Sequence, residues 1–151
     1  MNRIEAGRWA MTLVLVSTTV LSFVLDWSAN HLLNPAWHPH ARFHGALLLF
    51  MLAGVSATSL YLLWRRSCEL EVMVRIAGML SLAFWTPLFY ITSVLPSSTS
   101  WAGAPNADPR LSGYLFTPNL LVAAAFVVVS LAGIWVSFHP YKSAERLAGR
   151  R

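Results

Sequence analysis

The residues in this chain that are best suited to chemistry are concentrated in one short segment. Four of the five histidines lie within fourteen residues, an arginine lies among them, and an aspartate lies five residues before the first. These six residues are Asp26, His31, His38, His40, Arg42 and His44. Histidine changes its charge near neutral pH, and a carboxylate can orient an imidazole by accepting its N–H. The segment therefore has the composition of an acid–base site or of a metal site.

The spacing inside this segment predicts that two of the histidines act together. Pro39 is favoured in the first turn of a helix, where its missing N–H costs nothing. A helix that begins there places His40 and His44 four residues apart on one face. Two imidazoles at that spacing can bind one metal ion, or one ring can orient the other. His38 is a weaker candidate, because the residue before a proline favours an extended backbone.

An acid–base site is the first interpretation of the segment. Its catalytic residues would be His31, His40, His44 and Asp26. Its substrate-binding residues would be Arg42, Asn34 and Trp37. In this interpretation the aspartate orients a histidine that moves a proton, and the arginine holds a polar head or stabilises developing charge. Ionisable groups at a bilayer edge are costly unless they find water or one another, so we expect these residues to converge.

The composition of the whole chain places this segment in a membrane protein. Hydrophobic residues make up 56% of the 151 residues, charged residues make up only 11%, and the mean hydropathy is +0.56. Soluble domains carry about 25% charged residues, and disordered chains are poor in apolar residues. The single cysteine, Cys68, excludes an internal disulfide framework, a thiol relay and a cysteine-based zinc site.

Four apolar stretches are long enough to cross a bilayer as helices. They cover residues 9–24, 44–64, 76–95 and 119–138, and none contains Lys, Arg, Asp or Glu. None alternates with the period of two that a barrel strand requires. The sequence therefore predicts an all-α, integral membrane four-helix bundle that forms one domain over residues 1–151. Pro87 lies inside the third stretch and should kink that helix.

The positions of the basic residues predict the orientation of the bundle. Nine of them fall on one side of the expected spans: Arg3, Arg8, Arg65, Arg66, Arg75, Lys142, Arg146, Arg150 and Arg151. Only Arg42 and Arg110 fall on the other side. By the positive-inside rule, both termini are expected in the cytoplasm and the histidine segment on the opposite face. The net charge of +5 is thus a topology signal, and we expect no nucleic-acid partner.

The histidine segment also resembles the signature of a known family. Asp26-Trp27, His31, Asn34-Pro35, Trp37 and the run 39–44 (Pro-His-Ala-Arg-Phe-His) are similar to a pattern found in short, uncharacterised four-helix membrane proteins. That pattern contains Asn-Pro-x-Trp-Pro-Pro-His-Ala-Arg-Phe-His, and here His38 replaces the first proline of the Pro-Pro pair. The resemblance implies a four-helix membrane fold and a site in this segment. It implies no reaction.

Three functions stay open on the sequence alone. The first is an enzyme that isomerises, cyclises or hydrolyses a lipid-like small molecule. The second is a metal-, haem- or pigment-binding subunit, with His40 and His44 as ligands. The third is a structural or ligand-binding subunit without chemistry, in a homo-oligomer or a larger membrane complex. The sequence contains no Gly-x-Ser-x-Gly elbow and no Walker loop, which argues against those catalytic classes.

Overall fold

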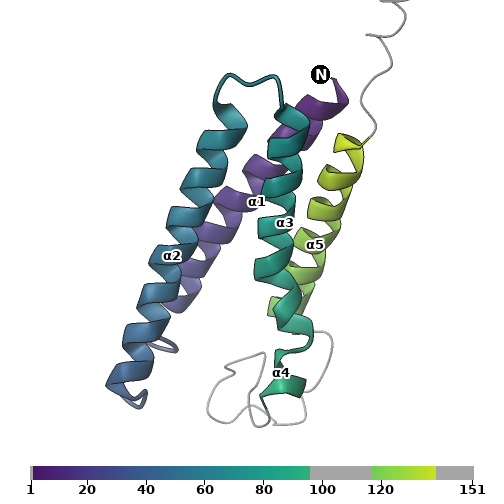
Figure 1. Cartoon of the computed structure of the whole chain (residues 1–151). Helices are drawn as coiled ribbons and strands as arrows, with labels where there is room; N and C mark the ends of the chain where they lie inside the picture. Colours follow the sequence, from purple (N-terminus) through teal and green to yellow (C-terminus); the bar gives the residue numbers. More distant parts are fainter. Residues whose placement is uncertain (1, 96–116, 139–151) are drawn as a thin grey trace, which may run out of the picture.

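The computed structural model describes residues 2–95 and 117–138, and every regular element in these two parts is helical (Figure 1). The four long helices are α1 (Arg3–Asp26), α2 (Pro39–Trp64), α3 (Leu70–Trp85) and α5 (Pro118–Ser137). Two short elements follow α3, the 3-10 turn η1 (Thr86–Phe89) and the single turn α4 (Ile91–Val94). Helices α1, α2 and α5 and the α3–η1 segment are each long and apolar enough to cross a membrane. The all-α, four-helix fold expected from the sequence is confirmed.

The first helix begins well before the apolar stretch that predicted it. The Asn2 side chain accepts a hydrogen bond from the Glu5 N–H at 2.8 Å, and the Glu5 carboxylate accepts one from the Asn2 N–H at 3.0 Å. This capping box satisfies N–H groups that have no partner within the helix. Helix α1 therefore adds a polar turn in front of its apolar stretch.

The α-helical part of the third spanning segment ends just before Pro87. Helix α3 stops at Trp85, and Pro87 lies in η1. The expectation of a kinked helix that continues to residue 95 is therefore wrong. Proline lacks an N–H and its ring crowds the preceding turn, so the backbone tightens into 3-10 geometry at this point.

The tightly packed core lies mainly where α1, α3 and α5 meet, and Leu63 of α2 reaches into it. Met11, Val14, Val74 and Ala77 are almost fully buried there. Helices α3 and α5 approach so closely that a Cβ added at Gly78 would clash with the Ile134 side chain. Small residues allow this close packing, which holds helices together in lipid, where burial from water contributes little.

Buried side-chain hydrogen bonds join the same three helices. The Ser130 hydroxyl donates to the Ser81 hydroxyl at 2.7 Å, between α5 and α3. The Trp85 indole N–H donates to the Thr18 hydroxyl at 2.9 Å, between α3 and α1. Such bonds pair polar groups that would otherwise lie unsatisfied in an apolar interior.

Helix α2 is the least enclosed of the four. Its buried residues are Leu49, Ser56, Ser59 and Leu63. In Figure 1, α2 and α3 are close at the 65–69 connection and separate steadily toward the opposite end of the bundle. We call that opposite end, which carries the 27–38 connection between α1 and α2, the histidine end. The divergence of α2 from α3 leaves room there for the first of the two cavities described below.

Candidate functional site

The connection between α1 and α2 is a series of hydrogen-bonded turns. The Asp26 carbonyl accepts a bond from the Leu32 N–H at 3.0 Å. The Ser28 carbonyl accepts one from the Leu33 N–H at 2.9 Å. The Asn34 side chain accepts a bond from the Ala36 N–H at 2.9 Å, an Asx turn of the kind that Asn favours. Asn34, expected to bind substrate, therefore shapes the backbone of this connection.

Leu32 anchors the connection to helix α2. Its side chain is buried and lies over Gly45, where an added Cβ would come within 2.6 Å of Leu32 Cδ2. Its carbonyl accepts a hydrogen bond from Arg42 Nε at 2.6 Å. Gly45 therefore permits the close approach, and Arg42 holds the turn from the other side. The sequence patterns considered above did not single out Leu32 or Gly45.

Asp26 and His31 lie together at one cavity. The cavity has a volume of about 240 Å³, and Trp37 and Gly45 also line it. The rest of its wall is apolar and consists of Leu32, Leu48, Leu49, Leu52 and Phe84. The carboxylate of Asp26 interacts electrostatically with His31, and the His31 ring meets Trp37 edge to face at 6.0 Å between centroids. Phe84 comes from α3, so the cavity lies between the diverging helices.

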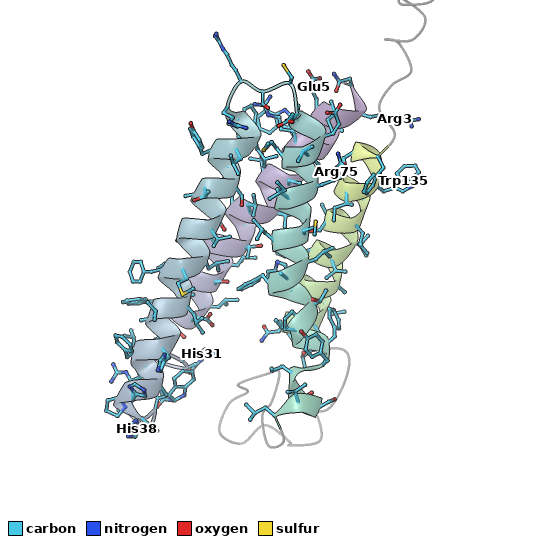
Figure 2. All side chains as sticks on the ribbon, viewed as in Figure 1. Arg3, Glu5, His31, His38, Arg75 and Trp135 are labelled. Atoms are coloured by element: carbon cyan, nitrogen blue, oxygen red, sulfur yellow. The ribbon has the colours of Figure 1, made fainter. Side chains whose placement is uncertain are left out.

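The His31 ring has an unused nitrogen. Its Nδ1 atom is buried and has no hydrogen-bond partner among the described residues. Buried polar atoms in native proteins are nearly always paired, so an orphaned nitrogen points to a partner that is bound from outside. A neutral imidazole can donate through one ring nitrogen and accept through the other. Figure 2 places His31 at the histidine end, far from Arg3 and Arg75 at the other end.

His40 and His44 form a separate pair on helix α2. The helix begins at Pro39, as the sequence predicts, and both histidines lie in its first two turns. Their Nε2 atoms are 3.0 Å apart, and their ring centroids are 4.4 Å apart at an interplanar angle of 84°. Both residues are exposed. His38 serves as the N-cap, since its Nδ1 accepts a bond from the His40 N–H at 3.2 Å.

The histidine pair points away from the cavity that holds Asp26 and His31. Residues 45, 48, 49 and 52 of α2 line that cavity. At 3.6 residues per turn, the mean direction of His40 and His44 is roughly 110° around the helix from that face. The expectation that these histidines converge with Asp26 at one point is therefore not met by the described contacts. The structure brings the residues together as two pairs, one in a cavity and one on an outer face.

Arg42 lies at a second cavity, apart from both pairs. This cavity has a volume of about 320 Å³, and its remaining wall consists of Trp27, Leu32, Leu33, Pro39, Phe43 and Ala46. Leu32 thus separates the two cavities, because it lines both. Arg42 lines the second cavity and not the one with Asp26, so its expected contact with a substrate stays a prediction from the sequence. Trp37, by contrast, lines the first cavity, where it covers His31.

The described part of the chain contains no cluster of three or more His, Cys, Asp or Glu residues that could hold a metal ion. A metal site built from residues 2–95 and 117–138 of one chain would therefore have two histidine ligands and would need others from elsewhere. The donors fit this role chemically, because neutral imidazole nitrogens are good ligands for Zn²⁺, Cu²⁺ and Ni²⁺.

The fold and its surface define the class of protein. Large apolar side chains are exposed around the outside of the bundle, among them Leu13, Phe50, Met79 and Val128. A soluble protein of this size does not expose so continuous an apolar surface, whereas a lipid-facing surface requires it. Four helices of spanning length with this surface are those of a multi-pass membrane protein.

The chain belongs to the DUF6640 family, a family of unknown function, whose model matches residues 11–148. The match covers nearly the whole chain, including the connection that carries Asp26, His31 and Trp37. No curated protein and no solved structure matches the chain. Family membership therefore agrees with the expectation of an uncharacterised family, and the chemistry has to be argued from the site.

Proposed function

We propose that this protein is a membrane-embedded enzyme that performs acid–base chemistry on a hydrophobic small molecule. The observation that carries the proposal is the cavity of about 240 Å³ in which Asp26 and His31 stand among apolar side chains. Ligand sites commonly combine a mostly apolar wall with a few converging polar groups. The volume lies just below the range of about 300–1,000 Å³ typical of such sites, so it suits a small molecule or one end of a long one.

His31 is the proposed general acid or base. Its unpartnered Nδ1 is free to exchange a proton with a bound molecule, and Asp26 would stabilise the imidazolium that forms. The apolar surroundings strengthen this interaction, since charges attract more strongly where water is excluded. Isomerisation, cyclisation and hydrolysis all need such a proton transfer. Trp37 is proposed to contact the substrate, and Arg42 and Asn34 to hold the connection in place.

We further propose that the site faces away from the cytoplasm. Five of the described arginines lie in the first turns of α1 and α3 or just after α2, at the end opposite the cavity: Arg3, Arg8, Arg65, Arg66 and Arg75. Figure 2 shows Arg3 and Arg75 at that end. Arg42 is the described arginine of the histidine end. This asymmetry supports an orientation with the arginine-rich end in the cytoplasm. A hydrophobic substrate would reach the cavity from the bilayer or from its outer surface.

The enzyme is tested with the full chain purified in lipid nanodiscs. The protein is incubated with a neutral-lipid extract of its own membrane, and mass spectrometry follows species that appear or disappear. His31→Gln and Asp26→Asn should each reduce the conversion by roughly 10²–10⁴-fold, the usual contribution of acid–base catalysis. His40→Ala is the matched control, because this histidine lies at the same end but lines neither cavity.

Two results of this experiment contradict the proposal. One is conversion that survives in both cavity variants. The other is a wild-type protein that binds a component of the extract and changes nothing in it, which would indicate a ligand-binding subunit without chemistry. The function of a metal-, haem- or pigment-binding subunit through His40 and His44 is the remaining alternative, and the short distance between these two rings favours it.

A further inference from the structure

The exposed histidine pair on α2 has the geometry of half a metal site. Two metal–nitrogen bonds of about 2.0–2.1 Å place their nitrogens about 2.9 Å apart at a right angle and about 3.3 Å apart at the tetrahedral angle. The Nε2 atoms of His40 and His44 are 3.0 Å apart, in a hydrogen bond between the two rings, and a metal ion that replaced the shared proton would meet both nitrogens at this spacing. This spacing is closer to the right angle, which square-planar Cu²⁺ and Ni²⁺ sites use.

Contacts with Phe43 restrain the rings of both histidines. The His40 ring stacks on Phe43 at 6.2 Å between centroids and 11° between planes. The His44 ring meets Phe43 at 5.5 Å and 73°. These contacts limit the rotation of both imidazoles, so less conformational entropy is lost when a metal binds. Both residues are exposed, so an ion can reach them.

One chain leaves this site incomplete. Two histidines fill only two positions, whereas a square-planar ion takes four ligands. The described part of the chain supplies no third His, Cys, Asp or Glu to the pair. A second copy inserted in the same orientation carries an identical pair at the same depth in the membrane. A two-fold axis along the membrane normal would bring the two pairs together.

The outer face of α2 supports contact with such a copy. From the histidines toward the C-terminal end of α2, one line of exposed residues follows alternating intervals of four and three positions: His40, His44, Leu47, Met51, Gly54 and Thr58. This is the period of a left-handed helix pair. Gly54 has open space around it, with nothing within 4 Å of an added Cβ. A small residue at that position lets two helix backbones approach closely in lipid.

We propose that a Cu²⁺ or Ni²⁺ ion bridges two copies of this protein through His40 and His44 of each, with α2 packed against α2 along this face. The inference is independent of the acid–base function, because it uses neither Asp26 nor His31. It assigns the histidine pair a role outside the cavity, on the exposed face of α2.

The test is a Cu²⁺ titration of the full, metal-stripped chain in detergent, followed by electron paramagnetic resonance and by sedimentation. We expect one ion per two chains, a spectrum with four imidazole nitrogens and a metal-dependent dimer. His40→Ala and His44→Ala should each lose more than the roughly 10–100-fold in affinity that removal of an outer partner costs. His31→Ala, a histidine outside the pair, is the control and should bind as the wild type does.

Gly54→Leu separates the helix contact from the ligands. Gly54 is exposed and an added Cβ meets nothing within 4 Å, so we expect the leucine to leave folding of the single chain intact but to hold two α2 helices apart. We expect this variant to bind one ion per chain through two nitrogens, with weaker affinity. A wild-type stoichiometry of one ion per chain, Cu²⁺ binding that survives loss of either histidine, or an intact metal-bridged dimer in Gly54→Leu would each overturn the proposal.

Discussion

The contact between Leu32 and Gly45 gives the sharpest prediction about how the site is held together. Adding a methyl group at Gly45 places a carbon 2.6 Å from Leu32 Cδ2, well inside van der Waals contact. Overpacking of this kind typically costs about 1–3 kcal/mol, and the better helix propensity of alanine offsets up to about 1 kcal/mol. We expect Gly45→Ala to destabilise the protein by roughly 0–2 kcal/mol.

The paired substitution shows whether this contact is the cause. Leu32→Ala alone removes a buried side chain and should cost about 2–5 kcal/mol. In the double variant the methyl group at position 45 no longer meets the Leu32 side chain. The loss in free energy of unfolding should therefore be smaller than the sum of the losses in the two single variants. Residues in contact usually couple by about 0.5–3 kcal/mol, and we expect about 1–3 kcal/mol here, the overpacking cost that Leu32→Ala relieves.

The assay is unfolding in detergent followed by tryptophan fluorescence, with a chelator present so that no metal bridges two chains. Gly54→Ala is the matched control, because a Cβ at that position meets nothing within 4 Å. It should leave the stability unchanged or raise it by up to about 1 kcal/mol. If the losses in unfolding free energy of Leu32→Ala and Gly45→Ala simply add in the double variant, the contact between these residues is not the cause of the destabilisation.

Three further predictions concern other parts of the bundle. Arg42→Ala removes the hydrogen bond to the connection and should lower the free energy of unfolding by about 1–2 kcal/mol, measured by the same assay; no loss would show that this bond does not hold the turn. Ser81→Ala and Ser130→Ala should each cost about 0.5–1.5 kcal/mol, and the double variant should cost less than their sum, because no hydroxyl is left unpaired; full additivity would contradict this. Cys68 is exposed on the protein, but an impermeant maleimide should not reach it in intact cells, because the arginine-rich end is expected in the cytoplasm. The variant Cys68→Ser with Asn30→Cys carries its cysteine at the histidine end and should be labelled. The reverse labelling pattern would show that the orientation is inverted.

Much of the fold follows from the sequence through the demands of the bilayer. A span must be apolar for about 20 residues and must satisfy its own backbone, so four uncharged stretches predict four helices. The start of α2 at Pro39 and the approach of His40 to His44 follow equally directly, since both depend on neighbours within two turns of one helix. The end of α3 before Pro87 was less predictable, because a proline can either kink a helix or end it.

The division of the polar residues into two pairs was decided by tertiary structure alone. Sequence spacing shows which residues share a helix face, but the direction of that face depends on how the helix is rotated against its neighbours. Helix α2 is rotated so that Leu49 and Leu63 are buried, and Leu32 rests on Gly45. These contacts turn the face of residues 45, 48, 49 and 52 toward the cavity with Asp26 and leave the two neighbouring histidines outside. The sequence by itself determined the membrane fold and the composition of the site. Packing between segments that are distant along the chain determined which of its residues can act together.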